Sequence, residues 1–153
     1  MARLRVSVRL DAPPSVVWDD LRRLDSHSEW MVDADVIRFT SATREGVGAT
    51  LECDTSLGPI HLTDRMTVTE WVPKRRIGVR HEGVVSGQGT IRLTRRPRQR
   101  TKLTWSEKLR FPWWMGGPIG SWLAAPVLMV IWRRSMRRLE QRFAGGRRLQ
   151  PSP

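Results

Sequence analysis

Several features typical of secreted, metal-binding and nucleotide-binding proteins are scarce in this sequence. It contains one cysteine, Cys53, which excludes an internal disulfide and a zinc site built from several cysteines. The three histidines, His27, His61 and His81, have no metal-ligand spacing. Neither a phosphate-binding loop nor a dinucleotide-binding glycine motif is present. We therefore expect no metal and no other cofactor. The first twelve residues lack the apolar core of a secretory signal, which predicts a cytoplasmic protein.

Acidic residues are scarce in the second half of the chain. Residues 78–153 contain sixteen Lys or Arg against three Asp or Glu, whereas residues 1–77 are nearly balanced, and the net charge is +12. Only three of the 27 basic residues are lysine, a bias typical of GC-rich genomes. A basic half of this kind is either a solvated surface or a site for a polyanion, such as an anionic membrane or nucleic acid. Nucleic acid is the weakest of these, because no recognised binding motif is present.

Charge is absent from residues 111–132, and four arginines follow: Arg133, Arg134, Arg137 and Arg138. About 20 apolar residues can cross a bilayer. Three prolines and three glycines interrupt this run, however, and leave about 15 residues, or roughly 22 Å of helix, after Pro118. We therefore favour a buried helix, covered on both sides and closing a pocket, over a membrane span.

Hydrophobic periodicity predicts the order of the elements. Alternation over residues 4–10 indicates a half-buried strand, and Pro13-Pro14 then opens a helix that ends at about Leu24. A short second helix is predicted at 26–31 and a long one at 118–144, kinked by Pro126. Between them, glycine and proline turns separate six strand-like segments, at 36–42, 49–56, 60–71, 76–83, 90–95 and 102–109. We expect a single domain over residues 1–146 and a disordered tail over 147–153.

Four local motifs follow one another in the order typical of a known superfamily. They are the Asp11-Ala-Pro-Pro-Ser-Val-Val-Trp18 segment, Trp30, the Gly46-Val-Gly48 turn and Val68-Thr-Glu-Trp-Val-Pro-Lys-Arg75. Together with the element order, they resemble the START-like (SRPBCC) superfamily, in its polyketide cyclase/dehydrase and lipid-transport branch. The resemblance implies an α+β helix-grip fold: a curved seven-stranded antiparallel sheet wrapped on a long C-terminal helix, with two short helices after the first strand. It also implies a cavity between the sheet and the helix.

Strand alternation predicts which side chains face that cavity. Asp64, His81 and Glu107 fall on inward positions of three strands and at about the same height, an arrangement that suits specific binding or acid–base chemistry. A register slip of one residue would turn each of them to solvent, and Asp64 would then pair with an arginine. The full predicted ligand-binding set is Leu62, Asp64, Met66, Val79, His81, Leu103, Trp105, Glu107, Trp114, Trp122 and Leu123.

The adjacent residues Trp113 and Trp114 lie in a loop rich in proline and glycine. Such residues either plug the mouth of a cavity, which we favour, or sit at a membrane interface. For the second case the candidate membrane contacts are Trp113, Trp114, Arg133, Arg134, Arg137 and Arg138, which would place the protein at the periphery of the inner membrane.

The sequence therefore predicts non-catalytic binding, for carriage or sensing, of a hydrophobic small molecule or lipid in an internal cavity. The alternative is a cyclase or dehydrase that uses Asp64, His81 or Glu107 as acid and base. A membrane-associated or nucleic-acid-binding basic protein is the weaker third interpretation.

Overall fold

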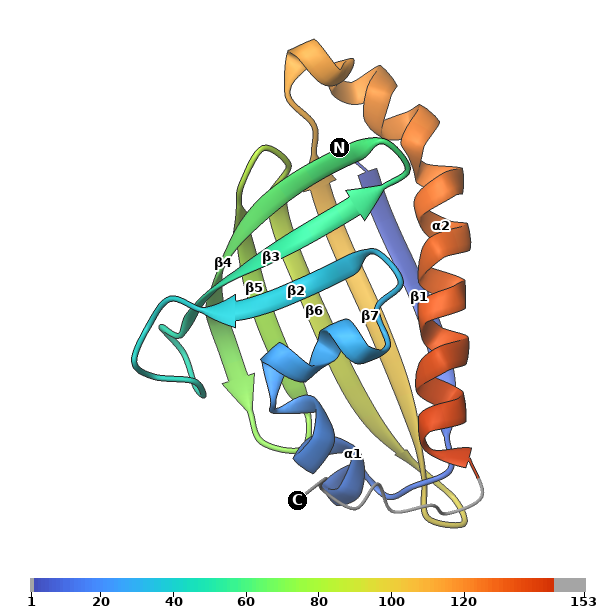
Figure 1. Cartoon of the computed structure of the whole chain (residues 1–153). Coiled ribbons are helices and arrows are strands. Elements are labelled where there is room, and N and C mark those ends of the chain that lie inside the picture. Colours follow the sequence, from blue (N-terminus) through green and yellow to red (C-terminus); the bar gives the residue numbers. More distant parts are fainter. Residues whose placement is uncertain (1, 145–153) are drawn as a thin grey trace.

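Seven antiparallel strands form one strongly curved sheet, and a long helix lies along the first and last strands (Figure 1). The computed structural model describes residues 2–144. In chain order the elements are β1 (Ala2–Leu10), α1 (Pro14–Leu21), the 3-10 helix η1 (Leu24–Glu29), β2 (Ala34–Phe39), β3 (Thr50–Leu57), β4 (Ile60–Val72), β5 (Arg76–Glu82), β6 (Ser86–Arg96), β7 (Arg100–Arg110), the 3-10 helix η2 (Trp113–Met115) and α2 (Gly117–Arg142).

The sheet has the strand order β1-β7-β6-β5-β4-β3-β2. Strands β2 to β7 are a meander of hairpins, and β1 pairs with β7, so the first strand of the chain lies beside the last. Positive φ angles occur in several hairpin turns, at Gly58 in the β3–β4 turn, where glycine favours them, and also at Lys74, Arg98 and Gln99. The predicted α+β helix-grip fold is confirmed.

The element boundaries differ from the prediction mainly near the first two helices. The first helix ends at Leu21, and the second begins at Leu24 as 3-10 helix, which fits its short, polar sequence. Strand β6 begins four residues before the predicted Thr90, because the segment around Gly87 and Gly89 pairs fully with its neighbours despite its low strand propensity. Tertiary pairing outweighs local propensity here.

Helix α2 buries one side and exposes the other. Its buried residues include Leu128, Trp132, Met136 and Leu139, at helical spacing, and Figure 1 shows the bend that Pro126 predicts in the first part of the helix. The expectation that its first half is covered on both sides is wrong. The outward side chains are exposed there, because this end of α2 extends beyond the sheet while α1 and η1 lie at the opposite end (Figure 1).

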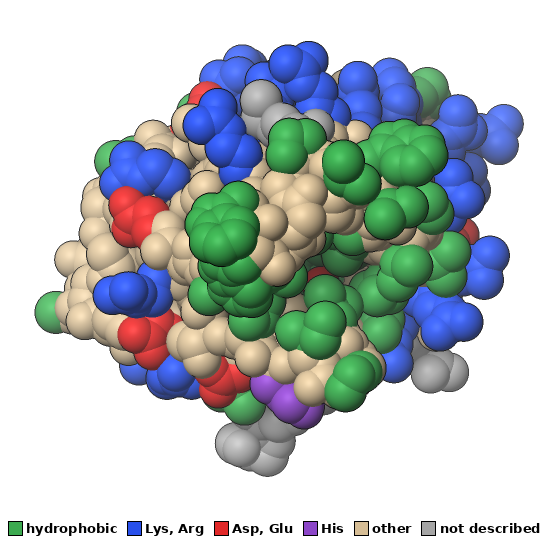
Figure 2. Space-filling model, turned by 90° about the horizontal axis from the view of Figure 1, so that it is seen from above, with side chains coloured by type: hydrophobic (Ala, Val, Ile, Leu, Met, Phe, Trp, Pro, Cys, Tyr) green, Lys and Arg blue, Asp and Glu red, His purple; other side chains and the backbone are tan. Residues whose placement is uncertain are grey.

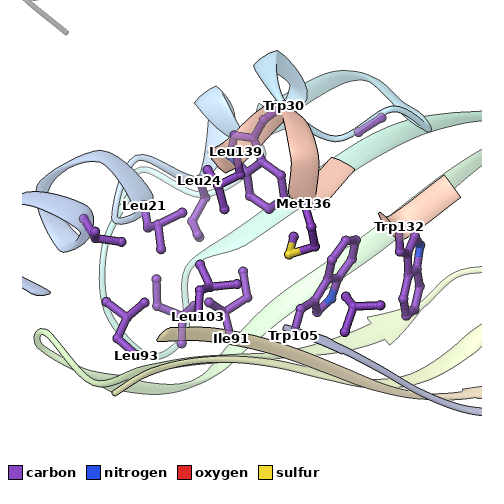
Figure 3. Close-up of a cluster of buried hydrophobic side chains, with 14 of the residues drawn as sticks. Leu21, Leu24, Trp30, Ile91, Leu93, Leu103, Trp105, Trp132, Met136 and Leu139 are labelled. Carbon is purple, nitrogen blue, oxygen red and sulfur yellow. The ribbon is translucent and has the colours of Figure 1, made fainter. Parts of the chain in front are cut away.

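Buried side chains from the sheet, α1, η1 and α2 form one hydrophobic core (Figure 3). At its centre Trp105 of β7 stacks on Trp132 of α2, with ring centroids 4.4 Å apart, and meets Trp30 edge-on at 6.0 Å. This aromatic cluster connects the sheet with α2 and with Trp30, the residue that follows η1.

No helix in the described part of the chain combines the length and the apolar character that a bilayer crossing needs. Helix α2 ends at Arg142, two residues before the predicted end at 144, and the predicted tail 147–153 lies outside the described residues.

Candidate functional site

A cavity of about 180 Å³ lies between the inner face of the sheet, η1 and α2. Most of its lining is aliphatic or aromatic, with Trp105 and Trp132 at the α2 side. The ionisable lining residues are His27, Asp33, Cys53, Asp64, His81 and Glu107. Seen from the end where η2 lies, the surface is hollowed, and hydrophobic side chains surround the hollow (Figure 2). The cavity is thus an apolar chamber with a small, concentrated set of polar groups, the usual composition of a small-molecule site.

Three of the polar groups converge on one point of the wall. His81 of β5 donates a hydrogen bond through its Nδ1 to Oδ2 of Asp64 on β4. On its other side, Nε2 of His81 lies 3.6 Å from Oε2 of Glu107 on β7. The indole Nε1 of Trp105, two residues before Glu107 on the same face of β7, donates to Oε1 of Glu107 at 2.9 Å. The imidazole is therefore held between two carboxyl groups, one of which is oriented by a core tryptophan.

Glycine on the intervening strand allows this contact. His81 and Glu107 belong to β5 and β7, which are separated by β6, and Gly89 of β6 pairs with Glu107. A Cβ on Gly89 would lie 3.1 Å from Oε1 of Glu107 and 3.2 Å from Nε2 of His81. With no side chain there, groups from two non-adjacent strands can meet across the third. Gly83 likewise leaves room for the side chain of Asp64, because a Cβ on Gly83 would lie 2.9 Å from Oδ1 of Asp64.

The environment changes the protonation of His81. Burial by itself would lower its pKa, but the hydrogen bond that His81 donates to Asp64 and the negative charge of Glu107 outweigh burial and raise the pKa to about 10. At neutral pH the ring is therefore an imidazolium between two carboxylates. Oδ1 of Asp64 and Nε2 of His81 are buried and have no hydrogen-bond partner among the described residues. One acceptor and one donor of these cavity-lining side chains thus lack a hydrogen-bond partner within the described structure.

The other ionisable lining groups lean toward their neutral forms. Burial raises the pKa of Asp33, and the nearby charge of Glu107 raises it further. Burial also raises the pKa of the Cys53 thiol, to about 11, which makes it a poor nucleophile. Burial lowers the pKa of His27, whose Nε2 donates to the carbonyl oxygen of Leu21 at 2.7 Å. Each of these shifts favours the neutral form of its group.

Seven of the predicted ligand-binding residues line the cavity: Leu62, Asp64, Met66, Val79, His81, Trp105 and Glu107. Four do not. Leu103 faces the core but lies farther along β7, where it pairs with Leu93 (Figure 3). Strand alternation gives the face of a residue, but not how far the cavity extends along the strand. Trp114, Trp122 and Leu123 are exposed at the outer end of the helix.

The two adjacent tryptophans do not plug the cavity. Trp113 and Trp114 are 87% and 60% exposed and are not part of its lining, so the favoured interpretation of this loop is wrong. Phe111, two residues earlier, lines the cavity instead.

Sequence reasoning missed Asp33, His27 and Gly89. Asp33 lies in the connection between η1 and β2, where no periodicity indicates which way a side chain faces. The glycine at position 89 was a usable signal, because glycine inside a strand often marks a close approach of another group. Within residues 2–144, no group of three or more His, Cys, Asp or Glu side chains is arranged to hold a metal ion.

Comparison with known proteins identifies the family. The sequence model of the family described as polyketide cyclase / dehydrase and lipid transport matches residues 1–144, and the chain belongs to that family. A search of curated protein sequences finds no match.

Solved structures share the fold at low sequence identity. The protein XoxI from Bacillus cereus is 16% identical, with a TM-score of 0.74 over 95% of this chain and 97% of that one. A solution structure from Thermobifida fusca is also 16% identical, with a TM-score of 0.74 over 100% of both chains. The Zhui aromatase/cyclase from a Streptomyces species is 18% identical, with a TM-score of 0.68 over 95% of this chain and 99% of that one. At these identities the likeness concerns the fold alone.

Proposed function

We propose that this member of the polyketide cyclase/dehydrase and lipid-transport family binds, without chemical change, a hydrophobic small molecule that carries one hydroxyl group. The observation that carries the proposal is the free donor and acceptor, His81 Nε2 and Asp64 Oδ1, on the wall of an apolar cavity. The apolar part of the ligand fills the chamber and its hydroxyl meets these two atoms. A hydroxyl fits because it accepts one hydrogen bond and donates another.

Charge argues against the other common head groups. An imidazolium between two carboxylates gives the cluster a net charge of −1, and Asp33 adds no favourable charge for an anion. A carboxylate ligand would have to take up a proton or would be repelled in this buried setting. An ammonium group cannot accept the hydrogen bond from His81. Selectivity for a neutral alcohol, phenol or enol follows.

Isothermal titration calorimetry with three matched probes tests the proposal: a naphthol, the corresponding naphthoic acid, and naphthalene. Hydrogen bonds to charged groups contribute about 1.5–3 kcal/mol, so we expect the naphthol to bind roughly tenfold or more tightly than naphthalene. The naphthoate should bind most weakly. Glu107→Gln removes one negative charge and should therefore reduce the difference in affinity between naphthol and naphthoate. Equal affinities for the two in the parent chain would refute the proposal.

Glu82→Gln is the matched control. Glu82 is the residue after His81 on β5, and its carboxylate is exposed, paired with Arg80. The substitution removes the same charge on the outer face of the sheet. It should leave the order of the three probes unchanged.

A second candidate function is dehydration of a β-hydroxyketone, which the protonation of His81 favours. The imidazolium would give a proton to the leaving hydroxyl, while a carboxylate of Asp64 or Glu107 removes the proton next to the ketone, so that water leaves and an enone forms. The proton on the carboxylate then returns to His81, and the groups are restored.

An aryl β-hydroxyketone tests this alternative, because its enone product absorbs strongly in the near ultraviolet. We expect the parent chain to bind such a compound without turnover. Formation of the enone by the parent chain and not by His81→Gln would establish the enzyme and overturn pure binding.

A further inference from the structure

The outward side of helix α2 changes its chemistry along its length. Five exposed residues at helical spacing form an apolar stripe: Ile119, Trp122, Leu123, Val127 and Val130. Ile119 and Trp122 are 70% and 74% exposed. The same side then continues as an arginine stripe, formed by the exposed residues Arg133, Arg134, Arg137 and Arg138. Apolar side chains at this exposure are costly in water unless something covers them.

Trp113 and Trp114 of η2 extend the apolar stripe beyond the start of the helix. The turn between η2 and α2 is made at Gly116, with φ of 90°, and both tryptophans are exposed. Figure 2 shows that hydrophobic side chains gather at this end of the molecule and that Lys and Arg side chains lie at their margin. The exposed surface thus combines aromatic rings, aliphatic side chains and neighbouring positive charge.

The positive charge of the arginine stripe is not neutralised within the described chain. None of its four arginines forms an ion pair with an Asp or Glu of residues 2–144. Two of them, Arg133 and Arg137, join Arg5 of β1 in lining a hollow between β1 and α2, which also contains Glu140. Three guanidinium groups around one hollow are suited to an anionic phosphate group.

We propose that the apolar stripe, the two tryptophans and the arginine stripe together form a docking surface for a membrane that contains anionic lipids. The aromatic and aliphatic side chains enter the interfacial region, where tryptophan is favoured, and the arginines contact lipid phosphates. The surface lies on the outside of α2 and does not depend on what the cavity binds.

Charge decides among the possible occupants of this surface. A second copy of the chain would have to associate against the mutual repulsion of a net charge of +12 on each chain, and it would leave the arginine stripe without an anionic partner if only the apolar stripes met. Nucleic acid would satisfy the arginines and leave the apolar stripe in water. An anionic membrane matches both parts, and binding at its surface agrees with helices that are too short or too polar to cross it.

Co-sedimentation of the full chain with vesicles tests the docking surface. One set of vesicles is pure phosphatidylcholine and the other an equal mixture of phosphatidylcholine and phosphatidylserine. We expect preferential binding to the anionic set, weakening as salt is added. Replacing the four residues of the arginine stripe by Gln should reduce binding to the anionic set by about tenfold or more. Trp122→Ser combined with Leu123→Ser should by itself reduce binding to the anionic set. It should also reduce the blue shift of tryptophan fluorescence that we expect when the parent chain binds these vesicles.

Four arginines of β6 and its turn provide the matched control. Replacing Arg92, Arg95, Arg96 and Arg98 by Gln removes the same charge from residues that lie outside the proposed docking surface. If this control lowers binding as much as the arginine-stripe variant, overall charge is responsible and the proposed surface is wrong.

Two further results would also overturn the proposal. One is equal binding to neutral and anionic vesicles. The other is a dimer in solution that Trp122→Ser dissociates, because the apolar stripe would then be an interface between copies. The naphthol titration does not involve this surface, so the two proposals succeed or fail separately.

Discussion

Replacing Glu107 by Gln should lower the pKa of His81 and change how the stability of the protein depends on pH. In the parent chain that pKa is about 10, because Asp64 and Glu107 both favour the imidazolium. An opposite charge at this distance raises a pKa by about 1–3 units, so loss of the Glu107 charge should lower the pKa of His81 by that amount. The contact to Asp64 remains and should keep the pKa above its ordinary value.

The same shift predicts the pH range in which stability is lost. The folded-state pKa of about 10 is higher than the ordinary value of 6.5, so protonated His81 stabilises the folded state. This stabilisation is complete below pH 6.5 and is lost as the pH rises to about 10. At about 1.4 kcal/mol for each pKa unit, it amounts to at most about 5 kcal/mol. Glu107→Gln should therefore reduce the loss of unfolding free energy over this pH range.

The assay combines two measurements on the parent chain, Glu107→Gln and the control Glu82→Gln. Histidine ring resonances followed by NMR over pH give the pKa of His81 directly. Urea unfolding at about pH 6 and about pH 9.5 gives the pH dependence of the unfolding free energy. A His81 that titrates near 6.5 in the parent chain, or an unfolding free energy that does not decline between these pH values, would refute the reasoning.

Three further predictions concern single residues. Gly89→Ala should displace Glu107 and His81, because the added methyl carbon would lie 3.1–3.2 Å from their side chains. We therefore expect weaker naphthol binding in calorimetry and a lower pKa of His81 by NMR. Unchanged values of both would contradict the role of Gly89. Trp105→Ala should reduce the unfolding free energy by about 3–5 kcal/mol in urea titrations, through loss of its stacking on Trp132, and a smaller effect would place it outside the core. Cys53 should react with iodoacetamide much more slowly in the folded chain than in urea, as followed by mass spectrometry, because burial raises its pKa to about 11; equal rates would contradict its burial.

Local sequence patterns were sufficient for the order and type of the secondary-structure elements and for which face of these strands is inward. Alternation of apolar and polar residues has a period of two in any strand, so the inward positions of Asp64, His81 and Glu107 could be assigned without a structure. The turns at glycine and proline set the lengths of the hairpins and with them the approximate height of each side chain. These properties depend on residues that are close in the chain.

Contacts in the cavity wall could not be predicted from local sequence patterns. Whether His81 of β5 reaches Glu107 of β7 depends on the side chain that β6 places between them, and Gly89 leaves that position empty. The same limit applies to Leu103, which faces inward but lies beyond the end of the cavity. The pKa of His81 likewise depends on burial and on two carboxylates from other strands.

Helix α2 shows most clearly the difference between what the sequence predicts and what the tertiary structure decides. The sequence by itself predicted a helix over residues 118–144, which the structure places at Gly117–Arg142, and showed that the charge changes from none to strongly positive at Arg133. Only the tertiary structure decided that the apolar side chains of its first half face outward rather than into a pocket. The physical reason is that burial depends on which elements pack on each side of a helix, and a curved sheet that grips one side of α2 leaves the other side to solvent or to a partner.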